Sequence, residues 1–301
     1  MMGTVTKQII DDMINTGLIR DLGSPWASPV VMIIKDRKKP IHKDNIRFCV
    51  DYRKINVLTM TDNYPIPDIQ QLLETFAGKK YFSKLDLTSG YWQVLLMERE
   101  KPRTAFITKW GLYEFNRLPF GLRNAPAAFQ RLMRKILRKQ IKKGICEVYL
   151  DDIIIASNTM AEHKAHVLEV LQVLRSRGWT VKSSKCVFFQ LEIKYLGHII
   201  SEEGLRIDPD KVEAIVKLNR PKDRKTVQRF LGSVQFLSKW IKNLQKRTAH
   251  ISDLLKKDVS FDWTDKQQKA WLSLKKALIT VPILKFPKVG IEFMIETDAS
   301  M

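Results

Sequence analysis

Hydrophobic and polar residues follow both helical and strand-like periods in the first sixty residues. The segment Thr6–Ile19 has apolar residues at helical spacing, and Gly17 is a typical helix-ending residue, so we predict a helix there. The β-branched run Val30–Ile34 and the segment Arg47–Tyr52 predict two strands that enclose a basic loop. Together these strands indicate a hairpin with a positively charged tip.

The next part of the chain has the short apolar runs of a sheet. We predict strands at Tyr81–Leu87 and Gln93–Met97, separated by a break at Thr88-Ser89-Gly90. A further hairpin is expected over Thr104–Phe115, with Gly111 near its tip.

A helix is predicted to begin at Pro126, because proline is favoured in the first helical turn. Its outer face is basic. The stretch Glu147–Ser157 then reads as two apolar strands joined at Asp151-Asp152. A helix over 161–177 and a pair of strands, Val181–Phe189 and Tyr195–Ile200, complete this region.

After Pro209 the pattern is helical, with predicted helices over 210–217, 223–242 and 264–278. This part is strongly basic, and we place a domain boundary near Ser201–Asp208. A last strand is expected over Gly290–Glu296, where the sequence has the appearance of a truncated chain.

The charge of the chain narrows the class of partner. Lys and Arg number 52 against 32 Asp and Glu among 301 residues, for a formal net charge of +20. Such an excess favours a polyanionic partner. No apolar run approaches the ~18 residues of a membrane-spanning helix, so we expect nucleic acid rather than a membrane as the partner. His163 and His166 lie on one face of a charged helix without a third metal ligand, and we expect both to be solvated.

The adjacent carboxylates Asp151 and Asp152 are open to two interpretations. Asp is common in tight turns, so the pair could be turn residues alone. However, the flanking strands are apolar at nearly every position, which predicts a buried hairpin. Two buried carboxylates repel one another unless cations compensate, and oxygen ligands favour Mg²⁺ or Mn²⁺ over zinc.

Asp86 ends another apolar strand, and a neighbouring strand could bring it beside the Asp151-Asp152 turn. Alone, a strand-end Asp is usually a cap or turn residue. Three convergent carboxylates could instead hold two Mg²⁺ ions, with Mn²⁺ as a substitute, roughly 3.5–4 Å apart. One ion would activate a primer 3′-hydroxyl, and the other would neutralise charge on the triphosphate and the departing pyrophosphate.

Six blocks along the chain resemble the reverse transcriptases of gypsy-type long-terminal-repeat retrotransposons. In order they are SPWASPVV, RFCVDYRKIN, KLDLTSGYWQV, YEFNRLPFGLRNAPAAFQRLM, VYLDDIIIAS and KYLGHIISEEG. The resemblance implies an α+β right-hand polymerase fold with an antiparallel palm sheet and a helical thumb. The implied domains are fingers (1–62 and 94–124), palm (63–93 and 125–203), thumb (204–258), a connection-like segment (259–290) and the first strand of a ribonuclease H domain (291–301).

The resemblance also implies roles for individual residues. Asp86, Asp151 and Asp152 match the catalytic, metal-binding triad, with the Leu87 carbonyl as an additional ligand. Arg47 matches a fingers arginine that contacts the incoming triphosphate. Lys35 is the matching lysine, although the loop 35–46 is longer than usual and lacks the customary Gly-x-Trp before the arginine.

Further nucleotide contacts follow from the same resemblance. Tyr91 matches the aromatic residue that excludes ribonucleotides, and Phe120-Gly121 matches the segment under the nucleotide base. Lys185 is assigned to protonation of pyrophosphate, with Lys182 close by. The chain should therefore bind deoxynucleoside triphosphates.

The resemblance assigns the contacts with the duplex to the later part of the chain. The primer grip corresponds to Tyr195-Leu196-Gly197-His198, and the thumb contacts correspond to Gln228, Arg229, Gly232 and Lys239. Asp298 matches the first ribonuclease H carboxylate, but the other carboxylates of that site are absent. We therefore expect no ribonuclease H activity from this chain.

The expected function is an RNA- and DNA-directed DNA polymerase of a retrotransposon. Its partners would be an RNA or DNA template–primer duplex, and it could form a homodimer or a heterodimer. It would act in the cytoplasm within a virus-like particle, with the nucleus as the alternative. Two other interpretations stay open: a non-catalytic nucleic-acid-binding protein, and a structural subunit of a heterodimer.

Overall fold

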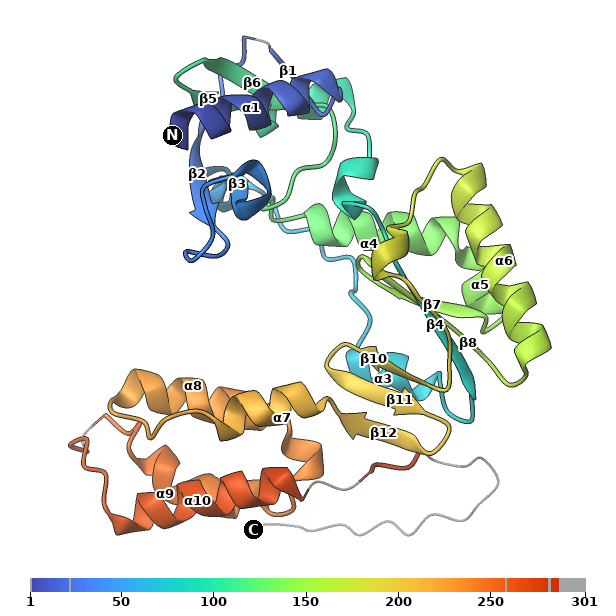
Figure 1. Cartoon of the computed structure of the whole chain (residues 1–301). Helices are drawn as coiled ribbons and strands as arrows, with labels where there is room; N and C mark the ends of the chain where they lie inside the picture. Colours follow the sequence, from blue (N-terminus) through green and yellow to red (C-terminus); the bar gives the residue numbers. More distant parts are fainter. Residues whose placement is uncertain (1, 22, 258, 281–282, 287–301) are drawn as a thin grey trace. The chain divides into compact units, whose positions relative to one another are not determined.

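The computed structural model describes residues 2–21, 23–257, 259–280 and 283–286 (Figure 1). The described residues divide into two compact units. The first unit draws on the ranges 1–68, 83–156 and 161–188, and the second draws on 69–82, 157–160 and 189–301. No helix in the described part of the chain is long and apolar enough to cross a lipid bilayer.

One sheet of the first unit has five strands in the order β1-β6-β5-β2-β3. These strands are β1 (Ile19–Asp21), β2 (Ser28–Ile34), β3 (Ile46–Val50), β5 (Phe106–Thr108) and β6 (Gly111–Phe115). Strands β2 and β3 are antiparallel, as are β5 and β6, so both predicted hairpins are confirmed. Helix α1 (Met2–Asn15) buries Ile10 and Met13 in the same core as Phe106 and Phe115 of the sheet.

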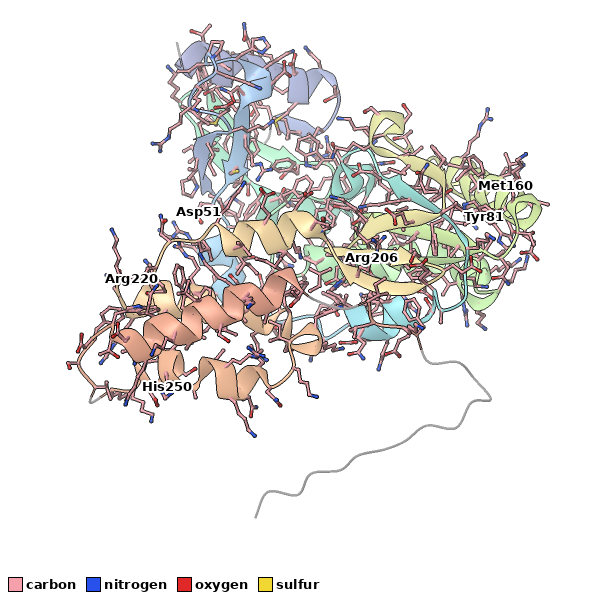
Figure 2. All side chains as sticks on the ribbon, turned by 60° about the horizontal axis from the view of Figure 1, so that its bottom comes forward. Asp51, Tyr81, Met160, Arg206, Arg220 and His250 are labelled. Carbon is pink, nitrogen blue, oxygen red and sulfur yellow. The ribbon has the colours of Figure 1, made fainter. Side chains whose placement is uncertain are left out.

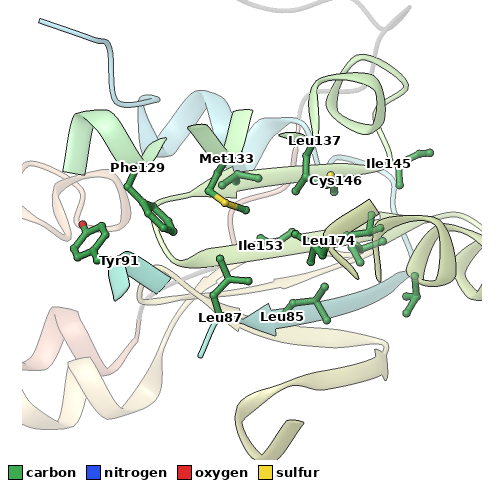
Figure 3. Packing of buried hydrophobic residues seen from close by; sticks show 14 of the residues in the cluster. Leu85, Leu87, Tyr91, Phe129, Met133, Leu137, Ile145, Cys146, Ile153 and Leu174 are labelled. Carbon is green, nitrogen blue, oxygen red and sulfur yellow. The ribbon is translucent and has the colours of Figure 1, made fainter. Parts of the chain in front are cut away.

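The second sheet has the strand order β7-β8-β4-β9. Its strands are β4 (Tyr81–Asp86), β7 (Cys146–Tyr149), β8 (Asp152–Ser157) and β9 (Val187–Gln190). Three helices, α4 (Ala125–Ile136), α5 (Arg138–Lys142) and α6 (Met160–Ser176), accompany it, and a short helix α2 (Arg53–Leu58) precedes it in the chain. Apolar residues of β4 and β8 pack with Phe129, Met133 and Leu137, as Figure 3 shows. A run of helical positions four apart therefore anchors α4 in the core.

The second unit combines a three-stranded sheet with helices. The sheet order is β10-β11-β12, formed by Glu192–Tyr195, His198–Ser201 and Gly204–Ile207. Arg206, labelled in Figure 2, forms an ion pair with Glu192. The helices are α3 (Ile69–Glu74), α7 (Pro209–Val216), α8 (Arg224–Gln235), α9 (Leu244–Asp253) and α10 (Asp265–Ile279). Capping boxes begin α8 and α10, at Asp223 and Thr264.

Several predicted elements are wrong or differ in extent. Residues 93–97 form no strand, because a 3₁₀ turn over Gly90–Gln93 precedes them and the Gln93 side chain bonds the backbone of Thr88 and Thr180. The predicted strand 181–189 contains a 3₁₀ turn, and 195–200 spans a turn between β10 and β11. The helix predicted over 223–242 ends at Gln235, and α9 was not predicted.

His163 is also placed differently from the prediction. It is fully buried, and its Nε2 lies 2.7 Å from the Ser83 hydroxyl. The bond joins α6 to β4. The sequence could not indicate this, because the serine lies eighty residues away and a serine in an apolar strand carries no signal for a histidine partner.

A buried ion pair in the five-stranded sheet joins β1 to β6. The Glu114 side chain is fully buried, and Arg20 lies 2.8 Å from its Oε1 through Nε and 2.7 Å through Nη2. The same guanidinium also contacts Glu98 at 2.7 Å. A buried carboxylate requires such a partner because removing the charge from water is costly.

We expect Arg20→Leu to lower the free energy of unfolding by about 2–3 kcal/mol, since it leaves the Glu114 charge buried and unpaired. Urea unfolding at neutral pH measures the loss. The double variant Arg20→Leu/Glu114→Gln should recover much of it, because the uncompensated charge is then gone. An equal loss in the single and double variants would contradict a role for the charge.

Candidate active site

The β7–β8 hairpin places two of the predicted carboxylates. Tyr149 pairs with Asp152, so the two-residue turn consists of Leu150 and Asp151 rather than of the two aspartates. Leu150 has a φ of 52°, a conformation that bulky residues rarely adopt. Asp152 is the first residue of β8, and the rest of that strand is buried. The predicted buried hairpin is therefore present, with its turn shifted by one residue.

The side chain of Gln130, on α4, fixes this turn by hydrogen bonds to its backbone. Its side chain is fully buried, donates to the Val148 carbonyl at 2.8 Å and accepts from the Leu150 amide at 2.6 Å. The amide thereby satisfies backbone groups that the turn leaves unpaired. The sequence analysis did not single out Gln130. A polar residue among Phe129 and Met133 on the apolar side of the helix is the signal that could have found it.

Asp86 ends β4, the strand next to β8 in the sheet. The Lys182 amide donates to the Asp86 carbonyl at 2.8 Å, and the Thr88 amide donates to Thr180 at 3.1 Å. Leu87 is buried and forms an isolated bridge with Val181. This pairing fixes the strand end, so the Asp86 side chain is held near the hairpin turn.

The three carboxylates interact electrostatically. Burial raises the pKa of Asp151, and the neighbouring charges of Asp152 and Asp86 raise it further, while Lys185 opposes them. Because each carboxylate contributes to this shift, the structure brings together the three residues that the sequence singled out as a cluster.

Two of the three carboxylates have lysine partners. The Lys84 ammonium lies 2.9 Å from Asp152 Oδ1, and the Lys185 ammonium lies 3.5 Å from Asp86 Oδ2. Asp151 Oδ1, in contrast, is buried and has no hydrogen-bond partner among the described residues. Lys84 was not predicted; its position two residues before Asp86 in the strand is the signal that could have found it.

A divalent ion fits this donor set. Asp151 carries a buried, unpaired oxygen, and two further carboxylates lie near enough to raise its pKa. Oxygen ligands of this kind suit Mg²⁺. Nevertheless, no three His, Cys, Asp or Glu side chains of the described residues are already arranged as a metal site. The lysines on Asp86 and Asp152 would have to move for all three carboxylates to share an ion.

Gly90 lies directly against Asp151. A Cβ atom at Gly90 would lie 2.5 Å from Asp151 Oδ1 and 3.0 Å from the Phe129 ring, far inside ordinary contact. Only glycine therefore leaves room for the carboxylate. Gly90 was predicted only as part of a break between strands and was not among the predicted site residues.

Tyr91 and Phe120 form an aromatic wall beside the carboxylates. Their ring centroids are 4.9 Å apart, and Tyr91 also packs edge-on against Phe129 at 4.9 Å (Figure 3). Burial and the Asp151 charge raise the pKa of Tyr91 to about 12, so its hydroxyl stays protonated. Phe120 is 47% exposed. Two of the predicted nucleotide-contacting residues, Tyr91 and Phe120, thus pack against each other.

Gly121 follows Phe120 with a φ of 95°, which favours glycine. The Asn56 side chain donates to its carbonyl at 2.8 Å and accepts from the Arg123 amide at 2.8 Å. Asn56 therefore fixes this loop. It is a positioning residue that the sequence analysis did not identify.

Arg47 and Lys35 lie in the β2–β3 hairpin, and both are exposed. Arg47 pairs with Ile33 in the strand register. Lys35 follows β2, and its ammonium donates to the Asp44 carbonyl at 2.8 Å. Their predicted contact with a triphosphate stays a prediction.

In the second unit, the predicted primer-grip segment is a tight hairpin turn. Tyr195 pairs with His198 across it, and Leu196 and Gly197 have φ values of 49° and 83°. Two positive φ angles match the turn type whose twist suits a hairpin. The segment is therefore not part of a continuous strand, although the predicted hairpin is present.

His198 is stacked between two aromatic rings of the same unit. Its centroid lies 5.4 Å from Phe236 and 5.1 Å from Trp240, with interplanar angles of 17° and 22°. Burial, with the charges of Lys211 and Lys239, lowers the pKa of His198 to about 4. The imidazole is therefore neutral at physiological pH.

The predicted thumb contacts have exposed side chains or backbone. Gln228, Arg229 and Gly232 lie on α8, and Lys239 lies in the 3₁₀ turn Ser238–Trp240. Their contacts with nucleic acid stay a prediction. Asp298 and the predicted strand 290–296 lie outside the described residues.

Comparison with known proteins agrees with this geometry. Residues 35–200 match the family model described as reverse transcriptase (RNA-dependent DNA polymerase). The retrovirus-related Pol polyprotein from transposon opus of Drosophila melanogaster is 38% identical over 100% of this chain and 31% of its own length. The corresponding polyprotein from transposon gypsy is 37% identical over 98% of this chain and 29% of its own length. The chain thus spans about a third of these relatives.

The fold is also that of known structures. The foamy viral protease-reverse transcriptase in complex with dsDNA has a TM-score of 0.84 and 23% identity, over 96% of this chain and 59% of that one. The same viral protein in complex with an RNA/DNA hybrid has a TM-score of 0.81 and 24% identity, over 93% of this chain and 37% of that one.

These likenesses confirm the predicted α+β right-hand polymerase fold and the predicted retrotransposon family. The family is generally dependent on divalent metals, which agrees with the carboxylate cluster. The matched residues include Asp86, Asp151 and Asp152. The chain belongs to the reverse transcriptase (RNA-dependent DNA polymerase) family.

Proposed function

We propose that this chain is an RNA- and DNA-directed DNA polymerase that adds deoxynucleotides to a primer 3′-hydroxyl during retrotransposon replication. The observation that carries the proposal is the convergence of Asp86, Asp151 and Asp152, with a buried and unpaired oxygen on Asp151. A polymerase needs acidic ligands to hold Mg²⁺ ions, which neutralise negative charge on the triphosphate and the departing pyrophosphate. The proposal does not include ribonuclease H activity.

The three aspartates would hold the catalytic Mg²⁺ ions, with the Leu87 carbonyl as a further ligand. When bound, the metal supplies electrostatic stabilisation of the charge that develops on the reacting oxygens. Lys84 and Lys185 pair with two of these carboxylates. The two lysines would therefore neutralise part of the cluster until the metal binds.

The first unit would also position the incoming nucleotide. The Arg47 guanidinium and the Lys35 ammonium carry the charge for a triphosphate, and guanidinium geometry suits phosphate oxygens. Lys185, beside Asp86, would donate a proton to pyrophosphate. Tyr91 and Phe120-Gly121 would contact the sugar and base, which is supported by the packing of the two rings and the constrained glycine.

The polymer substrate would be a template–primer duplex. Support comes from the net charge of +20 and from the foamy viral relatives, which were found with dsDNA and with an RNA/DNA hybrid. The Tyr195–His198 turn would contact the primer, while Gln228, Arg229, Gly232 and Lys239 would contact the duplex. We also propose action in the cytoplasm within a virus-like particle, as a monomer or dimer.

Primer extension tests the enzymatic proposal. With Mg²⁺ and a primed RNA or DNA template, Asp151→Asn should lower the extension rate by about 10²–10³-fold, because it weakens the hold on the Mg²⁺ ions that would stabilise charge in the transition state. The matched control Asp262→Asn, at an exposed position, should keep the wild-type rate. A wild-type chain that binds the duplex but incorporates nothing would show a binding protein instead of an enzyme.

Tyr91 should control the choice of sugar. We expect Tyr91→Ala to raise the rate of ribonucleotide incorporation relative to deoxynucleotide incorporation by about 10–100-fold, since it opens the space that a 2′-hydroxyl needs. Single-turnover rates with each nucleotide give this ratio, which does not depend on the fraction of active protein. Tyr91→Phe keeps the ring and should keep the exclusion. The same ratio in Tyr91→Ala and wild type would remove Tyr91 from this role.

The Asp151 pKa predicts a pH-dependent stability difference in the presence of a chelator. In the folded chain the pKa of Asp151 is raised above its ordinary value of 3.8. Ionisation of Asp151 therefore lowers the stability of the native state as the pH rises from 3.8 through the folded pKa. Asp151→Asn should therefore unfold at a higher temperature than wild type near neutral pH and at nearly the same temperature below pH 3.8.

Thermal unfolding across this pH range measures the difference. Mg²⁺ should stabilise the wild type more than the variant, since binding to the native state raises its stability. A difference in unfolding temperature between Asp151→Asn and wild type that does not change with pH would show that the Asp151 charge does not destabilise the folded chain. That result would have no bearing on the activity measurement.

A further inference from the structure

A basic pocket lies beside helices α4 and α5, apart from the carboxylates. Its volume is about 370 Å³, and its polar lining consists of Tyr64, Arg131, Arg134, Lys135, Arg138 and Lys142. All of these residues belong to the first unit. None of them is among the residues assigned to catalysis, nucleotide binding or the primer above.

The helix geometry separates this pocket from the catalytic turn. Phe129, Met133 and Leu137 face the core, where Gln130 also holds the turn. Arg131 and Lys135 each follow a core residue by two positions, which places them about 200° around the helix, on its other side. Both are exposed. A ligand in the pocket would therefore not occupy the catalytic cluster.

The cations form a row along the helix axis. Positions 131, 135, 138 and 142 are spaced by three or four residues, so they share one face. The Leu137 amide bonds to Met133 at 3.0 Å and the Ile141 amide bonds to Leu137 at 2.9 Å, which continues the helical path between α4 and α5. Eleven residues of helix extend about 16 Å. A single phosphate would cover only part of this row.

Carboxylates of the chain compensate only part of this charge. The Arg131 guanidinium donates to both oxygens of Asp62, at 2.6 and 2.7 Å. The charge of Arg134 favours the ionised form of Glu147 and so acts to lower its pKa. Within the described ranges, no carboxylate forms an ion pair with Lys135, Arg138 or Lys142. The neighbouring ion pairs are those of Arg131 with Asp62 and of Lys143 with Glu169. Like charges at helical spacing repel each other. Binding of an external polyanion would therefore relieve the repulsion between these cations.

The form of the pocket favours one polyanion. Guanidinium groups bind phosphate oxygens in pairs, and the Arg131 guanidinium lies 4.8 Å from the centre of the Tyr64 ring, which makes a flat, partly aromatic edge. The stretch from Lys135 to Lys142, about 10 Å long, would meet roughly three phosphates at the 3.4 Å spacing of one stacked strand. A nucleic-acid strand has both the repeated charge and the planar bases that such an edge can meet.

We propose that this pocket is an accessory site for the phosphate backbone of a single RNA or DNA strand, separate from the polymerase site. The strand would cross the exposed side of α4 and α5, with its phosphates against Lys135, Arg138 and Lys142. Binding here would keep a single-stranded part of the nucleic acid on the protein while the duplex occupies the catalytic unit. The site does not depend on the polymerase proposal, because its ligand is bound without chemistry.

The test uses the full chain, saturated with an unlabelled blunt primer–template duplex. A fluorescein-labelled single-stranded RNA is titrated by fluorescence anisotropy at several salt concentrations. The variant Lys135→Gln/Arg138→Gln/Lys142→Gln removes the three pocket cations that the proposal places against phosphates. The matched control Lys164→Gln/Arg175→Gln/Arg177→Gln removes three exposed cations on and just after α6.

We expect the pocket variant to raise the Kd of the strand about tenfold or more, and to reduce the salt slope by about two, since each lost phosphate contact lowers it by ~0.7. The control should stay within about twofold of wild type. Primer extension on a short template should be unchanged in both. The pair Lys135→Gln/Lys142→Gln, at exposed positions, replaces the triple variant if that one does not fold.

Two results would overturn the proposal. Equal losses in the pocket variant and the control would show a general effect of net charge. Competition by poly-glutamate as effective as that by unlabelled RNA would show a site for an acidic protein instead. Failure of primer extension in wild type, with the strand still bound at the pocket, would count against the polymerase proposal alone.

Discussion

The partly buried carboxylate of Asp151, with one oxygen that lacks a hydrogen-bond partner among the described residues, is the constraint around which the first unit is organised. A half-buried carboxylate with two others nearby is unfavourable for folding, yet apolar strands, a buried amide and a glycine hold it in place. Such a cluster has lower energy once a cation is present. The fold accepts a local cost for an arrangement suited to metal binding, which is common at functional sites.

The scaffold that maintains this arrangement is mostly uncharged. Strand order places β4 beside β8, so that two distant segments deliver their carboxylates to one end of the sheet. Gln130 fixes the turn through backbone groups, and Asn56 fixes the Phe120-Gly121 loop in the same way. Neutral amides can orient the backbone without adding net charge beside the cluster. Lys84 and Lys185 are charged, and they compensate Asp152 and Asp86.

The periodic elements could be predicted because their signals are local. Pro126 at the start of α4, the β-branched run of β2 and Gly111 at a hairpin tip all gave the correct elements. Segments whose conformation depends on distant partners were mispredicted. Residues 93–97 resemble a strand, but Gln93 is engaged by Thr88 and Thr180, and the turn at Leu150 requires the distant Gln130.

The candidate site shows the same division. The three aspartates are recognisable because acidic residues in apolar strands are uncommon. Gly90 carries meaning only through its distance to Asp151, and the sequence does not contain that distance. Resemblance to a family supplied the roles of Tyr91 and Phe120, and the structure adds that their rings are packed together.

The stacked ring of His198 has a mechanical consequence. Phe236 and Trp240 lie on either side of it, and the first follows α8 directly while the second ends the adjoining 3₁₀ turn. The stacked, neutral imidazole forms a rigid link between the β10–β11 turn and the helices of the same unit. A tilt of α8 would therefore be passed to the backbone at Leu196 and Gly197 instead of being absorbed by side-chain rotation.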